Sequence, residues 1–192
     1  MHKARLEAFS DGVMAVIITI MVLELKAPEG ASWEALRALR PAFLSYVLSF
    51  VMLGIYWNNH HHLLQATHHV NGRILWANLH VLFWLSLIPF ATAWMGSNFD
   101  SFPVAIYGTI LLLAAIAYYI LVRALIASHG KQSPIATAIG RDFKGKISPL
   151  FYVIAILLAF YNPEYSCALY VTVAIIWLVP DRRIERMYES RD

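Results

Sequence analysis

The feature that most constrains the fold is an apolar run that begins directly after a charged and polar octet. The octet is residues 5–12, RLEAFSDG, and the run that follows, residues 13–23, has no charged side chain and one hydroxyl, that of Thr19. A helix needs roughly 20 apolar residues to cross about 30 Å of hydrocarbon, and residues 9–25 come close to that length. Ionisable side chains at the edge of a membrane helix usually mark a pathway or a structural contact. We therefore predict a first membrane span with an unusually polar entry.

The rest of the chain repeats the apolar pattern. Of its 192 residues, 59% are hydrophobic and only 14% are charged, whereas soluble domains carry about 25% charged residues. Five further segments reach or approach spanning length: residues 41–64, 74–95, 102–126, 147–161 and 165–179. Open strands would leave backbone groups unsatisfied in lipid, so each segment is expected to be a helix. The sequence predicts an all-α integral membrane protein with six spans forming one domain, residues 1–192, and with Pro89 kinking the third.

Basic residues orient the predicted spans. If the N-terminus is cytoplasmic, twelve Lys and Arg fall on the inner side and three, Lys26, Arg37 and Arg40, on the outer side. By the positive-inside rule both termini are cytoplasmic, and a multi-pass protein of the inner (plasma) membrane without a cleavable signal peptide is expected. The net charge of +3 fits membrane anchoring better than nucleic-acid binding.

The last two segments leave an alternative open. Each is only about 15 residues long, so they form either two short spans or a re-entrant hairpin. We prefer two spans, because the basic residues that flank the pair, Lys144, Lys146, Arg182 and Arg183, can snorkel to the interface.

On residue types alone, an ordinary structural role explains the octet. Ser10 or Asp11 could cap the first turn or complement the helix dipole, and Arg5 could be a positive-inside anchor. The pattern Arg5-x-x-x-Phe9-Ser10-Asp11-Gly12, however, resembles the signature of the transmembrane protein 175 family, the endosomal and lysosomal potassium channels with prokaryotic relatives. The resemblance extends to Ala15, Thr19 and Leu23-Glu24, and to Trp57-x-x-His60 in the second segment. One departure is Leu64, where the family usually has an aromatic residue.

The resemblance implies a channel of the prokaryotic, single-repeat branch, assembled as a homotetramer in the lipid membrane. Span one of each subunit would line a central pore, potassium would be the permeant ion, and no cofactor is expected. The chain lacks the Thr-Val-Gly-Tyr-Gly carbonyl filter of ordinary potassium channels. By position, the resemblance assigns the hydrophobic constriction rings to Val16, Ile20 and Leu23, with a hydroxyl from Thr19.

The spacing of these residues is compatible with that role. Val16, Ile20 and Leu23 follow the i, i+4, i+7 pattern and share one helix face, with Thr19 beside them. Four such stripes around an axis would form a narrow apolar gate. Ordinary helix packing produces the same pattern, so the spacing alone does not decide between the two.

The polar residues of the octet are predicted to form a hydrogen-bonded lock. Arg5 and Asp11 are six residues apart, too far around a helix to pair, so each is expected to reach another helix. The predicted lock joins Arg5, Ser10 and Asp11 to Trp57 and His60 of span two; the motif residues Phe9 and Gly12 are grouped with it. Asn58, Asn59 and Asn78 could also bond between helices.

The eight histidines do not predict a metal site. Adjacent helical residues point about 100° apart, so His60, His61 and His62 cannot chelate one ion together, and a zinc site needs three or four converging ligands. Water-facing histidines are expected, with proton sensing as the alternative. The single Cys167 excludes an intrachain disulfide.

The sequence favours one function class, leaves a second open and disfavours a third. A potassium-selective cation channel is favoured by the resemblance and by the uncharged first span. A small proton-coupled secondary transporter is the alternative, although such proteins usually carry an acid at mid-span or an internal repeat, and neither is present. An enzyme is not expected, since no nucleophile, acid pair or metal motif of useful specificity occurs.

Overall fold

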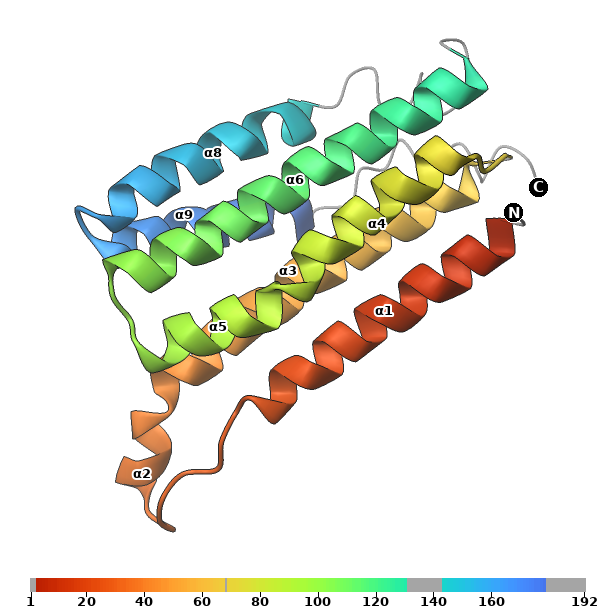
Figure 1. The fold of residues 1–192 in the computed structure, drawn as a ribbon. Coiled ribbons are helices and arrows are strands. Elements are labelled where there is room, and N and C mark those ends of the chain that lie inside the picture. The colour runs from red at the N-terminus through yellow and green to blue at the C-terminus, as the bar shows by residue number, and fades with distance from the viewer. Residues whose placement is uncertain (1–2, 68, 131–142, 179–192) are drawn as a thin grey trace.

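The computed structural model describes residues 3–67, 69–130 and 143–178, with Phe143, Lys144 and Lys146 described by their backbone only. This part of the chain is helical and forms one bundle (Figure 1). The helices are α1 (Lys3–Leu23), α2 (Trp33–Ala38), α3 (Arg40–Gln65), α4 (Gly72–Ser86), α5 (Ile88–Ser97), α6 (Ser101–His129), α8 (Phe143–Ala159) and α9 (Pro163–Leu178).

Four stretches within the described residues are long and apolar enough to cross a membrane: α1, α3, the α4–α5 pair and α6. The all-helical membrane fold is therefore confirmed, whereas the count of six spans stays a prediction, because α8 and α9 are shorter apolar helices. Helix α1 begins by Lys3, so the polar octet is itself helical. It ends at Leu23, two residues earlier than predicted, ahead of Pro28 and of Gly30, whose φ is 123°.

The third predicted span is broken just before Pro89. Helix α4 ends at Ser86, Leu87 separates the two helices, and Pro89 lies in the first turn of α5. Proline has no N–H, and its ring clashes with the carbonyl four residues earlier, so the helix cannot continue straight through this point. The two pieces still follow one another along the bundle (Figure 1).

Between α1 and α3 the chain forms the short helix α2, which extends beyond the end of the bundle (Figure 1). The Ser32 hydroxyl caps it by accepting a hydrogen bond from the Ala35 N–H, at 3.2 Å. Hydrogen bonds from its own backbone N–H and from Ser32 lower the pKa of Glu34. Glu34 therefore keeps a negative charge on this connection at neutral pH.

Close packing holds α3, α5 and α6 together. A Cβ added at Gly96 would lie 2.8 Å from the Ala42 Cα, so α5 and α3 meet backbone to backbone. Deeper in the interface, the buried Ser49 hydroxyl lies 2.7 Å from the Thr92 hydroxyl and donates to the Tyr107 hydroxyl at 3.1 Å. Small residues and hydroxyl bonds are the usual means by which membrane helices associate.

Helices α8 and α9 form an antiparallel hairpin beside α6, and their turn lies at the same end of the bundle as the start of α6 (Figure 1). The Asn162 side chain caps α9 by accepting from the Glu164 N–H at 2.8 Å. The Tyr170 hydroxyl donates to the Val104 carbonyl at 3.1 Å, and the Tyr170 ring fills the space above Gly108. The hairpin is thus anchored on α6, and whether both helices cross the membrane stays a prediction.

Candidate functional site

Helix α1 has one face inside the bundle. Its buried residues are Leu6, Ser10, Met14, Ile17 and Met21, which recur every three or four positions, as one face of a helix requires. They pack toward α3, α4 and α5. This buried face fixes which way the rest of α1 points.

The four residues predicted to line a pore lie on another face of α1, which the described part of the chain leaves open. The exposed fractions are 55% for Val16, 43% for Ile20 and 79% for Leu23, and Thr19 is also exposed. The Thr19 hydroxyl donates to the Val16 carbonyl at 2.8 Å. We call these four residues the α1 stripe.

A shallow groove of about 800 Å³ separates the α1 stripe from α5. Phe9 and Gly12 line it together with Val16 and Ile20, and Phe90 forms part of the opposite wall. Phe9 is half exposed, and nothing lies within 4 Å of a Cβ built on Gly12. The structure thus places these two motif residues beside the stripe and away from the predicted lock.

Ser10 joins α1 to α3 through a residue of α4. The Asn78 amide nitrogen donates to the Ser10 oxygen at 2.9 Å, and the Asn78 carbonyl oxygen lies 2.6 Å from the His60 Nε2. Ser10 in turn donates to the Leu6 carbonyl at 2.8 Å. Since the Asn78 oxygen can only accept, His60 must carry its proton on Nε2. All three side chains are at most 1% exposed, and we call them the Ser10–Asn78–His60 network.

A second set of contacts joins α1 to α3 directly. The Trp57 indole N–H donates to the Asp11 carboxylate at 3.0 Å, and Lys3 donates to the Gln65 carbonyl at 2.8 Å. Between them, Glu7 lies 3.6 Å from the His61 Nδ1. Lys3, Glu7 and Asp11 recur every fourth residue, so they form one row along α1.

The predicted lock residues are therefore divided between these two sets of contacts. Asp11 meets Trp57 as expected, but Ser10 reaches His60 only through Asn78. Arg5 is exposed and has no hydrogen bond or ion pair with the described residues. From the sequence, Asn78 was only one of three asparagines that could bond between helices. What distinguishes Asn78 in the sequence is that its amide lies inside an otherwise apolar segment, where a polar group needs a partner.

Known proteins share the sequence of this region. The family model for the endosomal/lysosomal potassium channel TMEM175 matches residues 5–89, a region that contains the octet, the α1 stripe and, apart from Lys3, the residues of both sets of contacts. A potassium channel of Chryseobacterium sp. is 57% identical over 187 residues, which cover 97% of each chain. The chain belongs to the TMEM175 family.

Other relatives extend the comparison. A potassium channel of Streptomyces collinus is 33% identical over 61% of each chain. The crystal structure of a lysosomal potassium-selective channel TMEM175 homolog from Chamaesiphon minutus covers 92% of this chain and 96% of its own, with a TM-score of 0.81 and 25% identity. The human endosomal/lysosomal proton channel TMEM175 is 36% identical over 83 residues, which are 35% of this chain and 16% of that protein. As a TMEM175 family member, the chain is of the ion-channel class and not an enzyme.

Among the described residues, the histidines do not converge on one point. His62 and His69 are seven residues apart and would share a face of one continuous helix, but α3 ends at Gln65. His68 lies outside the described residues. His69 instead contacts His129, whose Nε2 accepts from the His69 backbone N–H at 3.2 Å. No group of three or more candidate metal ligands occurs among the described residues.

Proposed function

We propose that this chain is a potassium-selective cation channel of the inner (plasma) membrane, with four copies surrounding a pore lined by α1. The six spans, the cytoplasmic termini and the tetramer belong to the same proposal. Support for potassium comes from the bacterial relatives, which are named potassium channels. The main observation in favour of this pore is the α1 stripe, which is uncharged, apolar apart from Thr19, and exposed on a helix whose other face is buried.

The stripe suits an apolar constriction. Four copies of Val16, Ile20 and Leu23 around one axis would present aliphatic rings to the ion, and narrow rings of this kind gate by removing water. The Thr19 hydroxyl adds one polar atom. Because its proton is donated to the Val16 carbonyl, its oxygen keeps lone pairs that can face a passing cation.

The groove between α1 and α5 supports assembly. Phe90 is 60% exposed and Phe9 is 50% exposed on its two sides, so both rings are available to pack against a neighbouring subunit. We expect that subunit to cover the part of the groove formed by Phe9 and Phe90 and to leave Val16 and Ile20, which line the groove as well, open to the pore. Such a neighbour would also hold the α1 stripe on the inner side of the ring.

The test is ion flux into liposomes that contain the purified protein. We expect potassium flux above sodium flux, with Ile20→Asn changing the rate or the selectivity. Val22→Asn is the matched control, because Val22 is similarly exposed at 47% but lies about 160° around α1 from Ile20, at ~100° per residue. A wild-type flux in Ile20→Asn, with the oligomer intact, would remove the stripe from the pore.

Proton flux is measured in the same liposomes, because the vertebrate relatives are named proton channels. Saturable flux coupled to a second solute would instead identify a secondary transporter. A channel predicts flux that rises with the gradient and needs no second solute.

A further inference from the structure

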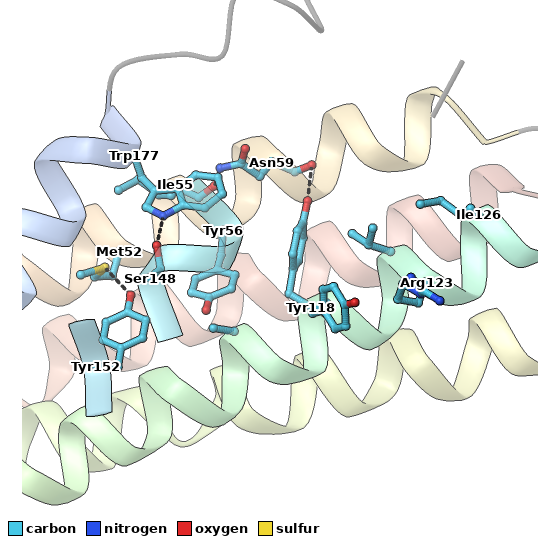
Figure 2. A pocket seen from close by; sticks show the side chains of 14 residues that line it. Met52, Ile55, Tyr56, Asn59, Tyr118, Arg123, Ile126, Ser148, Tyr152 and Trp177 are labelled. Atoms are coloured by element: carbon cyan, nitrogen blue, oxygen red, sulfur yellow. Dashed lines mark hydrogen bonds between the residues drawn. The ribbon is translucent and has the colours of Figure 1, made fainter. Parts of the chain in front are cut away.

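A second cavity lies away from the α1 stripe, in the half of the bundle formed by α3, α6, α8 and α9. Its volume is about 240 Å³. Figure 2 shows Met52 and Tyr152 at one end and Arg123 and Ile126 at the other, with Trp177 and Ser148 along one side. The proposed function makes no use of this cavity.

The cavity walls are largely hydrocarbon and aromatic ring. Most of the polar atoms shown in Figure 2 are already paired: Tyr118 donates to the Asn59 carbonyl at 3.1 Å, Trp177 to the Ser148 hydroxyl at 2.8 Å and Tyr152 to the Met52 sulfur at 3.9 Å. At about 30 Å³ per water, the space equals roughly eight waters, which would find few partners here. An apolar chain fits these walls better than solvent does.

One end of the cavity is positively charged. Arg123 is exposed and has no ion pair with the described residues, and its guanidinium presents five donors in a planar fork that matches phosphate. Gly145 lines the same cavity and stands between Lys144 and Lys146 in the sequence. An acyl chain that entered here would leave its head group beside Arg123.

We propose that this cavity binds one acyl chain of an anionic phospholipid, with the lipid phosphate paired to Arg123. Two features together indicate an anionic phospholipid: the cavity is apolar, and a cation lies at its open end. Basic pockets between membrane helices recognise anionic head groups. The site is separate from the α1 stripe, so it is tested by lipid binding and not by conduction.

The experiment uses the full chain in nanodiscs that contain phosphatidylglycerol with a diazirine on its acyl chain. After irradiation, peptide mapping locates the labelled residues. We expect labels on the cavity residues of α3 and α6, including Met52 and Val122. The same diazirine chain on zwitterionic phosphatidylcholine should label these residues roughly tenfold less, a ratio that corresponds to about 1.4 kcal/mol.

Two variants, each with a control variant, test the two halves of the site. Arg123→Gln should reduce phosphatidylglycerol labelling of the cavity to the phosphatidylcholine level, whereas Arg73→Gln, which removes an arginine on α4, should leave it unchanged. Ala115→Trp fills the cavity and should abolish the label; Ile116→Trp, at the same depth on an exposed part of α6, should not.

Three results would overturn the proposal. Equal cavity labelling by the two lipids, or labelling unaffected by Arg123→Gln, would refute head-group recognition. Labels confined to the outer surface of the bundle would show that no lipid chain enters, as when another part of the protein fills the space. Because Arg123 is exposed, Arg123→Gln leaves the packing intact, so the test holds even if Ala115→Trp fails to fold.

Discussion

Replacing Asn78 with alanine removes both hydrogen bonds that join α4 to α1 and α3. In the native structure Asn78 accepts from His60 and donates to Ser10, and all three residues are buried. The His60 Nδ1 has no partner among the described residues. In Asn78→Ala, neither ring nitrogen of His60 keeps a side-chain partner.

The expected loss follows from these contacts. Hydrogen bonds between membrane helices average about 0.6 kcal/mol each, so two contribute roughly 1.2 kcal/mol. A buried polar group left unpaired costs about 1–3 kcal/mol more. We therefore expect Asn78→Ala to lower the free energy of unfolding by about 2–4 kcal/mol.

The assay is denaturant unfolding of the purified protein in detergent micelles, with Asn59→Ala as the control. The Asn59 amide donates to the Ile55 carbonyl of its own helix, at 2.7 Å, so its loss breaks no side-chain bond between helices and should cost under about 1 kcal/mol. A double-mutant cycle with His60→Ala should give a coupling energy above about 0.5 kcal/mol. Equal destabilisation by the two asparagine variants, or additivity with His60→Ala, would refute this account of the network.

Three further predictions concern other contacts. Trp57→Phe removes the donor to Asp11 and should cost about 1 kcal/mol, because the pair is partly exposed; unchanged unfolding would show that the bond contributes nothing. Gly96→Ala forces a methyl group against the α3 backbone and should lower stability by about 1–3 kcal/mol, whereas Gly54→Ala, with open space around it, should be neutral or stabilising; the reverse order in thermal unfolding would contradict the packing. Tyr170→Phe should raise amide hydrogen exchange in α8 and α9 selectively, since it removes a bond to α6; a uniform rise would argue against a separately docked hairpin.

Hydropathy predicted where the helices lie, because membrane helices must be both apolar and long. The errors are at the ends. Helix α1 already includes Lys3 and therefore the whole polar octet, and it stops at Leu23. Arg, Leu, Glu and Ala are good helix formers whatever their hydropathy, while Pro28 and Gly30 follow the end of the helix. The break before Pro89 was predictable from backbone chemistry alone.

The orientation of each helix about its axis was harder to predict. The α1 stripe is apolar apart from Thr19, but much of the buried face is apolar too, with Met14, Ile17 and Met21. In a membrane, lipid, protein core and subunit interface all accept aliphatic side chains, so periodicity cannot assign a face to one of them. The assignment of Val16, Ile20 and Leu23 came from the family resemblance, and their role in conduction stays a prediction.

The polar contacts show which part of the structure the sequence alone could not predict. Ser10, Asp11, Trp57 and His60 were singled out, yet the partner of Ser10 is Asn78 on a third helix. A sequence shows that a buried polar group needs a partner but not which neighbour supplies it. The row Lys3, Glu7 and Asp11 could have been found from its four-residue spacing alone.

The Ser10–Asn78–His60 network and the α1 stripe are connected because α1 is one unbroken helix from Lys3 to Leu23. Val16 follows Ser10 by six residues, so at ~100° per residue it lies about 120° around the axis. While Ser10 stays bonded to Asn78, Val16 and Ile20 cannot turn into the bundle. A rotation of α1 that moved the stripe would have to break or stretch the Ser10 bond, so the network contributes to the energy of any such rotation, together with the row Lys3, Glu7 and Asp11. If α1 lines the pore, Asn78→Ala should therefore change potassium flux as well as stability, although Asn78 lies on α4 and not on the stripe.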